Sequence, residues 1–331
     1  MLAEALAAAA QQSPDRIALD DGRHRVAYGD LAALVEEEGA WLAGHGERFA
    51  LLADNGIGWA IADLALHTRA LPSVPLPGFF SAAQVQHALD DAGVDCVLTD
   101  DPQRLRALLP GWQAAGASGR SGLAMFRRQL DAAARQPLPP GTAKITYTSG
   151  STGQPKGVCL GAGQLEAVAA SLAQATASFN VERHLCLLPL ATLLENLAGI
   201  YVPLLSGATC LLPPAAITGM SYAGPDVARM LACIAGSRPQ SLVLVPELLR
   251  VLVTAAERGW AVPDSLRFVA VGGAPVSVGL LERADAAGIP VFEGYGLSEC
   301  ASVVCLNTPQ ARRRGSVGRP LPHARLRIAD D

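Results

Sequence analysis

The sequence predicts an α/β protein with largely parallel sheets flanked by helices, and two patterns carry this prediction. Short apolar or β-branched runs alternate with helical patterns along almost the whole chain, as in sheets joined by helical crossovers. Several helical stretches also open with a start signal, such as Asp30, Ser81 or Pro246. A length of 331 residues suits two domains or one large α/β unit.

The strands are expected in the apolar runs and the helices in the stretches between them. The expected strands are residues 48–53, 94–99, 144–148, 184–188, 208–212, 241–245, 267–271 and 290–292. The expected helices are residues 1–10, 30–42, 56–69, 81–92, 165–179, 225–236, 246–258 and 278–287. The last residues, 324–331, are expected to form a strand without a cap or tail, after which we expect further chain.

The stretch from Pro110 to Pro140 interrupts the alternation of strands and helices. Glycine, serine and alanine precede a short helical pattern over residues 124–135, and a proline-rich run follows over 136–140. We therefore expect a first α/β subdomain over residues 1–140 and a second over residues 141–331.

The composition excludes several classes of protein. Half of the residues are hydrophobic and 17% are charged, so the chain is neither disordered nor fibrous. The net charge of −4 provides no basic field that would hold a nucleic-acid backbone. We expect no nucleic-acid partner, whereas a small anionic ligand needs only a local basic site.

The seven cysteines are dispersed and mostly lie in apolar runs, which indicates buried free thiols in a reducing compartment, the cytoplasm. No positively charged segment precedes the alanine-rich start, so a helix is expected there and not a signal peptide. The longest apolar stretch, residues 186–212, is interrupted by Pro189, Glu195 and Pro203. We interpret it as a buried core segment and not as a transmembrane span.

The most specific feature is a loop rich in glycine, serine and threonine that follows the strand expected at residues 144–148. From Tyr147 to Val158 it reads Tyr-Thr-Ser-Gly-Ser-Thr-Gly-Gln-Pro-Lys-Gly-Val. Hydroxyls and backbone N–H groups in such a turn bind phosphate oxygens, and Lys156 adds a positive charge. The loop is not a Walker A motif, because Pro155 and Gly157 flank the lysine. A polyphosphate is the expected ligand.

This loop resembles the phosphate-binding motif of the adenylate-forming (AMP-binding) superfamily, which includes acyl-CoA synthetases, fatty acyl-AMP ligases and nonribosomal adenylation domains. Other stretches that resemble motifs of this family follow in its order, namely residues 13–19 with 26–31, 271–275, 293–299 and 315–320. The resemblance implies the large N-terminal domain of that fold, with two mostly parallel sheets flanked by helices. The small mobile C-terminal domain of the family is expected to be absent.

The resemblance also implies a role for each motif residue. Thr148, Lys156 and Glu299 would be catalytic, with Lys156 on the phosphates of ATP and with Thr148 and Glu299 at a Mg²⁺ ion. Tyr295 would stack on adenine, unless it is a core aromatic. The nucleotide-binding residues would be Ser149, Gly150, Ser151, Thr152, Gly153, Gly272, Gly273, Ala274, Tyr295, Gly296 and Ser298.

The implied reaction is attack of a small-molecule carboxylate on the α-phosphorus of ATP, which gives acyl-AMP and pyrophosphate. A thiol then displaces AMP and forms a thioester. That thiol would belong either to CoA or to the phosphopantetheine group of an acyl carrier protein. The protein would thus be an AMP-forming acid–thiol ligase.

The acyl pocket is expected around Thr192, Leu194, Glu195 and Asn196, in a stretch that resembles the pocket-lining segment of acyl-CoA synthetases. Thr192 stands where those enzymes carry a histidine, and residues 190–192 include no acid that would pair with the ammonium group of an amino acid. An apolar acyl chain is therefore expected, as in fatty acid metabolism. Glu195 is either the missing pocket acid or a cap or core hydrogen-bonding residue.

Chains of this family continue with an acid that binds ribose, a hinge and a small domain that carries a lysine. No lysine follows Lys156 here. We therefore expect a part of a longer enzyme or a naturally shortened member, and poor activity of the isolated chain. The alternative is a non-catalytic adenylate-binding or scaffold module.

Overall fold

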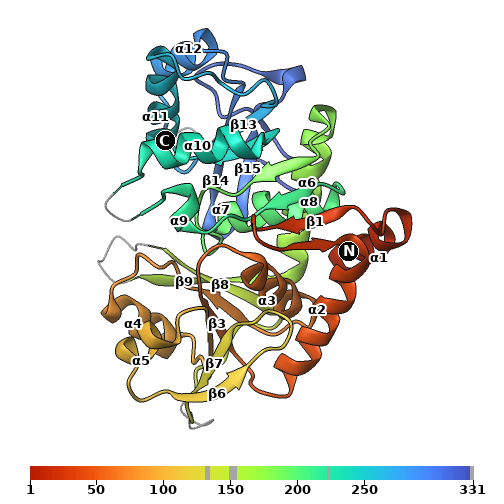
Figure 1. Ribbon diagram of the computed structural model, residues 1–331, viewed down its shortest axis with the longest axis vertical. Coiled ribbons are helices and arrows are strands. Elements are labelled where there is room, and N and C mark those ends of the chain that lie inside the picture. Colours follow the sequence, from red (N-terminus) through yellow and green to blue (C-terminus); the bar gives the residue numbers. More distant parts are fainter. Residues whose placement is uncertain (131–134, 149–154, 222–223, 329–331) are drawn as a thin grey trace. The chain divides into compact units, whose positions relative to one another are not determined.

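The computed structural model describes residues 1–130, 135–148, 155–221 and 224–328. These residues form two compact units. Unit 1 comprises Met1–Leu165 and Pro189–Leu193, and unit 2 comprises Glu166–Leu188 and Leu194–Asp331. The boundary expected between residues 140 and 141 lies inside unit 1. Both units combine strands with helices (Figure 1), which confirms the α/β fold class.

Unit 1 is built on a mixed sheet with a parallel centre. Its helices are α1 (Leu2–Gln12), α2 (Tyr28–Ala43), α3 (Ile57–Thr68), α4 (Ala82–Asp91) and α5 (Pro102–Leu108). Its strands are β1 (Ile17–Asp20), β2 (Arg25–Ala27), β3 (Phe49–Leu52), β4 (Ser73–Pro75), β5 (Cys96–Thr99), β6 (Gln113–Ala117), β7 (Ala124–Arg127), β8 (Thr142–Thr148) and β9 (Lys156–Gly161). The main sheet has the order β6-β7-β5-β3-β4-β8-β9. Its inner strands β5, β3, β4 and β8 are parallel, and the outer strands pair antiparallel.

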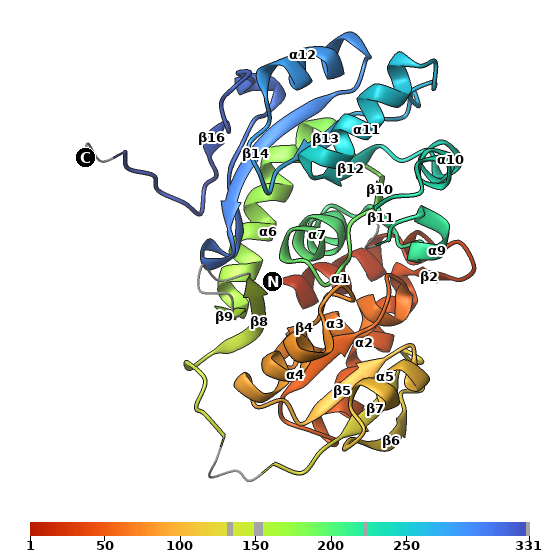
Figure 2. The ribbon, with the colours of Figure 1, turned by 90° about the vertical axis from the view of Figure 1, so that its left-hand side faces the viewer.

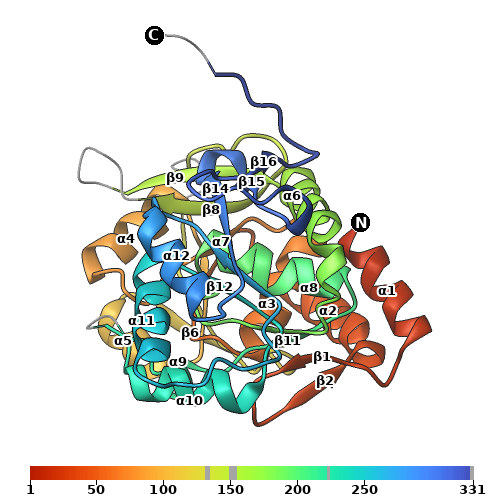
Figure 3. The ribbon, with the colours of Figure 1, turned by 90° about the horizontal axis from the view of Figure 1, so that it is seen from above.

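Helices cover both faces of this sheet, as expected for parallel strands that are apolar throughout. Side chains alternate along a strand, so Ala50 and Leu52 of β3 share one face. They join a buried cluster with Val85 and Leu89 of α4 and Leu105 of α5. Helix α3 contacts β3, β4 and β8. Figures 1 and 3 show α2 and α3 on the opposite side of the sheet from α4 and α5.

Unit 2 contains a second mixed sheet. Its helices are α6 (Ala162–Thr176), α7 (Leu193–Asn196), α8 (Val202–Leu205), α9 (Ala215–Thr218), α10 (Val227–Ser237), α11 (Pro246–Glu257) and α12 (Val278–Ala286), and α6 and α7 begin in residues of unit 1. Its strands are β10 (Arg183–Leu185), β11 (Thr209–Leu211), β12 (Ser241–Leu244), β13 (Phe268–Val271), β14 (Val291–Leu297), β15 (Ser302–Leu306) and β16 (Arg319–Pro320). Strands β11, β10, β12, β13 and β14 are parallel neighbours, and β14, β15 and β16 pair antiparallel.

The core of unit 2 lies between these parallel strands and three helices. Met230 of α10, Leu252 of α11 and Leu281 of α12 are buried in one cluster with Leu242 and Val269 of the sheet. Figure 2 shows the three helices along the same side of β10, β12 and β13. In each sheet an expected motif follows the carboxyl end of a parallel strand: the phosphate loop follows β8, and the glycine turn follows β13.

The start signals agree with the helices that form. Ser81 caps α4, and its hydroxyl accepts a hydrogen bond from the Gln84 N–H group at 3.3 Å. Pro246 occupies the first position of α11, where its missing N–H group costs nothing. Asp30 lies in the first turn of α2, which begins two residues earlier than predicted, at Tyr28.

Two expectations about local structure are wrong. The helical piece predicted over residues 124–135 begins instead with strand β7, because Ala124–Arg127 pairs with both β5 and β6. The strand predicted over residues 324–331 is not formed in its described part, residues 324–328. Figure 2 shows this segment running away from the body of unit 2 after β16, and Ile328 is 94% exposed.

The apolar stretch at residues 186–212 begins directly after β10 and folds into α7, a π-helical turn at Leu197–Tyr201, α8 and strand β11. Among the described residues, none of the helices combines the length and apolar character needed to cross a membrane. The cysteines, all of which lie in described parts of the chain, are free thiols, and Cys300 is exposed.

Candidate functional site

The expected phosphate loop joins β8 and β9 of unit 1. Thr148 ends β8, Lys156 begins β9, and the two residues are direct partners in the antiparallel ladder. Thr148 is half-buried and Lys156 is exposed. The expected ligands Ser149, Gly150, Ser151, Thr152 and Gly153 lie outside the described residues. The hairpin thus holds the hydroxyl of Thr148 and the ammonium group of Lys156 at the two ends of the loop.

Two side chains of α4 anchor the base of this hairpin. His87 Nε2 lies 2.9 Å from the carbonyl oxygen of Pro155, and because a carbonyl only accepts, Nε2 carries the proton. The Tyr147 hydroxyl donates to Asp91 Oδ2 at 2.6 Å. Burial, reinforced by the Asp91 carboxylate, raises the pKa of Tyr147 above its usual range. The end of β8 and the residue that precedes β9 are therefore fastened to α4.

Gly157 allows the Tyr147 side chain to lie across the hairpin. A Cβ atom at Gly157 would come within 2.9 Å of Ile145 and 3.1 Å of the Tyr147 ring. A larger residue would push the ring away from Asp91.

The other lysine of the chain, Lys144, is buried and paired with an acid. Lys144 is 1% exposed, and its Nζ atom donates to Asp63 Oδ1 of α3 at 2.6 Å. Burial lowers the pKa of Lys144, while the Asp63 carboxylate opposes the shift. Of the two lysines, Lys156 is the one that is accessible to an anionic ligand.

In unit 2 the glycine turn at residues 272–274 lies beside strand β14. Strand β13 is parallel to β14, with Val271 opposite Glu293, and the turn follows directly. A Cβ atom at Gly272 would lie 3.4 Å from the Gly294 carbonyl oxygen, and Gly273 has a φ of +86° that favours glycine. The structure therefore brings two expected nucleotide-binding stretches together.

The end of β14 carries the next group of expected residues. Tyr295 is 41% exposed, so it is not a core aromatic. Gly296 faces β15 so closely that a Cβ atom would lie 1.9 Å from the Ser302 carbonyl oxygen. The chain then turns through a 3₁₀ segment, Ser298–Cys300, where Ser298 is half-buried and the Glu299 carboxylate is exposed.

Asn307 connects β14 to the motif at residues 315–320. Its Nδ2 group donates to the carbonyl oxygens of Glu293 at 3.0 Å and Ser316 at 2.5 Å, and its Oδ1 accepts from the Arg313 N–H group at 2.9 Å. Gly318, with a φ of +89°, passes Leu306 too closely for any side chain. Asn307 thus positions the loop against the strand that carries Tyr295.

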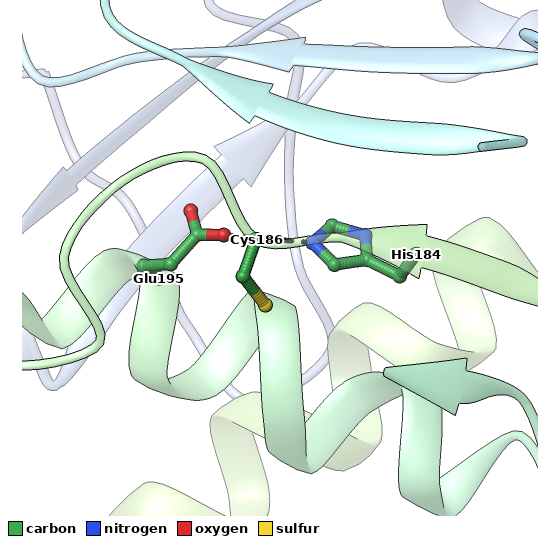
Figure 4. A group of neighbouring side chains, drawn as sticks. All are labelled: His184, Cys186 and Glu195. Atoms are coloured by element: carbon green, nitrogen blue, oxygen red, sulfur yellow. Dashed lines mark ion pairs between the residues drawn. The ribbon is translucent and has the colours of Figure 1, made fainter. Parts of the chain in front are cut away.

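The expected acyl-pocket residues have different environments. The Thr192 hydroxyl donates to the Pro189 carbonyl oxygen at 2.7 Å, Leu194 is half-buried, and Asn196 is buried. Glu195 has no exposed surface, and its carboxylate lies beside His184 and Cys186 (Figure 4). Burial raises the pKa of Glu195. This environment agrees with a core role for Glu195, one of its two interpretations.

Sequence reasoning missed the residues that position the site, namely His87, Asp91, Asn307 and the partners of Glu195. Their roles arise from contacts between segments that are distant in the chain, so no local motif indicates them. The structure alone shows which groups they contact.

Comparisons with known proteins agree with this fold. The family model described as "AMP-binding enzyme" matches residues 6–331. The 2-succinylbenzoate–CoA ligase of Bacillus subtilis (strain 168) is 26% identical over 328 residues, which cover 97% of this chain and 64% of that protein. A feruloyl-CoA synthase of an Amycolatopsis species is 31% identical over 334 residues, with coverage of 97% and 64%.

A solved structure has a similar fold. The o-succinylbenzoate CoA synthetase of Bacillus subtilis, in complex with ATP and a magnesium ion, has a TM-score of 0.74 and 26% identity. The match covers 99% of this chain and 67% of that chain. This chain spans about two thirds of the length of its relatives. Because the family model matches nearly every residue, the chain belongs to the AMP-binding enzyme family.

Proposed function

We propose that the protein activates a carboxylic acid with ATP and transfers the acyl group to the thiol of CoA. The observation that carries the proposal is the pairing of Thr148 with Lys156 on either side of a glycine, serine and threonine sequence. Family membership and two relatives named as CoA ligase and CoA synthase support the same reaction. A phosphopantetheine thiol on an acyl carrier protein is the alternative acceptor.

In the first step, a carboxylate oxygen of the substrate attacks the α-phosphorus, the bond to the β-phosphate breaks and pyrophosphate leaves. In the second step, the thiol sulfur attacks the acyl carbon, AMP leaves with the bonding electrons and the thiol proton goes to solvent. The protein contributes no nucleophile, so it acts by positioning and by neutralising charge.

The proposed roles follow the environment of each residue. Lys156, exposed at the start of β9, binds the phosphates, and Tyr295, exposed at the end of β14, stacks on adenine. The backbone of the glycine turn offers close approach to the nucleotide. The proposed nucleotide-binding residues are Ser149, Gly150, Ser151, Thr152, Gly153, Gly272, Gly273, Ala274, Tyr295, Gly296 and Ser298.

Magnesium suits the donors that the chain offers. The exposed Glu299 carboxylate and the Thr148 hydroxyl are hard oxygen ligands of the kind that Mg²⁺ prefers. Bound Mg²⁺ would supply neutralisation of the polyphosphate charge. Glu299 sits on a short 3₁₀ turn between β14 and β15, which fixes its backbone.

An uncharged, apolar acyl group is the proposed substrate. Around Thr192 the neighbouring side chains Leu190, Ala191 and Leu193 are apolar and buried. Within residues 189–196, all of which the structure describes, the only acid is Glu195, which is buried beside His184 and is not available to pair with an ammonium group. The relatives' names specify 2-succinylbenzoate, which carries a second carboxylate, and a feruloyl group, which carries a phenol, so aromatic acids belong in the test beside fatty acids.

Single-turnover adenylation tests this proposal. The chain, in excess over ATP labelled at the α-phosphate, is mixed with Mg²⁺ and one acid at a time, and labelled acyl-AMP is separated from AMP. Apolar acids should give acyl-AMP, and free amino acids should not. Formation of aminoacyl-AMP as the main product would contradict the apolar pocket. ATP binding without adenylate from any acid would favour the scaffold module.

A further inference from the structure

Three side chains of residue types that can bind metal ions form a buried cluster inside unit 2. His184 belongs to β10, Cys186 follows that strand, and Glu195 belongs to α7. Their exposed fractions are 4%, 0% and 0%, and their ligand atoms all lie within 4.8 Å of one another. Figure 4 shows the imidazole ring and the carboxylate facing each other beside the thiol.

The hydrogen bonds of the cluster leave strong polar atoms without a partner. His184 Nδ1 lies 2.8 Å from Ser241 Oγ, so Nε2 is the atom directed at Glu195. By hydrogen-bond geometry, His184 Nε2 and both Glu195 carboxylate oxygens are buried without a partner among the described residues, although His184, the Cys186 thiol and the Leu187 backbone lie near enough to the Glu195 carboxylate to oppose the rise of its pKa. Their separation, 3.8 Å between Nε2 and Oε1, is longer than a hydrogen bond. Burying such groups unpaired costs about 1–3 kcal/mol each.

We propose that His184, Cys186 and Glu195 bind a divalent transition-metal ion, and that Zn²⁺ fits best. The imidazole nitrogen, thiolate and carboxylate are the usual zinc ligands, and tetrahedral geometry with bonds of about 2.0–2.3 Å separates donors by about 3.3–3.6 Å. The observed 3.8 Å between nitrogen and oxygen needs only a small contraction. A thiolate and a carboxylate together balance the two positive charges, so no net charge is buried.

The surroundings fit ligands of a metal ion. Ser241 holds the other ring nitrogen of His184, which is the way that metal-bound histidines are usually oriented. A Cβ atom at Gly199 would lie 2.6 Å from Cys186 Sγ and 3.1 Å from Glu195 Oε1, so glycine leaves room for both donors. The chain at Leu197–Tyr201 forms a π-helical turn, a feature common at functional sites.

When the metal ion binds, the ligand atoms lose their protons and form bonds to the metal. The Cys186 thiol, which lies 3.4 Å from the Gly199 carbonyl oxygen, loses its proton to solvent and its sulfur bonds to the metal. A protonated Glu195 would release its proton likewise. The bound ion would fasten the end of β10 to α7, the helix that carries the proposed pocket residues Leu194 and Asn196.

Cobalt titration tests the site directly. The chain is treated with a chelator, dialysed and titrated with Co²⁺, because a thiolate bound to Co²⁺ gives a charge-transfer band in the near ultraviolet. We expect the band to saturate at one equivalent and to disappear when one equivalent of Zn²⁺ is added. In a separate sample that has not been treated with chelator, metal analysis of the wild-type chain should give one zinc per chain.

Variants separate the cluster from other thiols. Cys186→Ser should abolish the band, and Ser241→Ala, which removes the partner of the His184 ring, should weaken Co²⁺ binding about tenfold. Cys300→Ser, which changes the exposed thiol, should leave the titration unchanged. A folded wild-type chain without the band, or a band that Cys300→Ser removes, would overturn the proposal. The first of these results would leave a metal-free network of acid, imidazole and thiol.

Discussion

At the scale of single residues, the two lysines have opposite surroundings. Lys156 is exposed at the start of β9, where its ammonium group is accessible to a ligand. Lys156→Ala should therefore lower the affinity for Mg·ATP about tenfold or more, as expected for loss of a charged hydrogen bond. Isothermal titration of the variant measures the change. Arg23→Ala removes an exposed charge elsewhere in unit 1, and a loss of similar size in this control would refute the assignment of Lys156.

Lys144 should affect stability instead of ligand binding. Asp63→Asn leaves its ammonium group buried without a carboxylate, so the free energy of unfolding should fall by about 3–5 kcal/mol. The double variant Asp63→Leu/Lys144→Met removes both charges and should recover most of this loss. Chemical denaturation measures these differences. Equal stability of the wild type and Asp63→Asn would contradict a buried ion pair.

At the scale of elements, α4 and the β8–β9 hairpin should behave as one structure. Tyr147→Phe removes the hydroxyl that donates to Asp91, and His87→Ala removes the donor to the Pro155 carbonyl. Each change should increase amide hydrogen exchange in β8 and β9 but leave β3 unchanged, because only the hairpin loses its anchor. His87→Gln retains a donor and should restore part of the protection. Unaltered exchange in the hairpin of both variants would show that α4 does not hold it.

The elements also show how far the sequence predicts the fold. The parallel strands and amphipathic helices are predicted because apolar periodicity and caps such as Ser81 are local signals. Ala124–Arg127 has helix-forming residues, yet pairing with β5 makes it a strand, since tertiary contacts override propensity. Strand β9 is missed because glycines at both ends make it resemble a loop.

The candidate site is predictable only where its residues form a continuous motif. Thr148, Lys156, Tyr295 and Glu299 belong to such motifs, whereas their supporting partners come from distant segments. Glu195 is an example, because it lies beside His184 of β10, and the His184 ring is in turn held by Ser241 of β12. Its burial is a property of the folded chain, so the sequence left its role open.

At the scale of the whole molecule, each unit carries its own group of the proposed nucleotide-binding and catalytic residues. Unit 1 supplies Thr148 and Lys156, and unit 2 supplies the glycine turn, Tyr295 and Glu299. An acyl-adenylate presents both a nucleotide and an apolar acyl group. Free ATP, which lacks the acyl group, gains less apolar burial and should bind more weakly.

The most direct measurement of the central claim is isothermal titration of the purified chain with a non-hydrolysable fatty acyl-adenylate analogue and, separately, with Mg·ATP. We predict saturable binding of the analogue with one site per chain, clearly tighter than that of Mg·ATP. Absence of binding for both ligands by a chain that is folded, as judged by circular dichroism, would contradict the proposed acid-activating function.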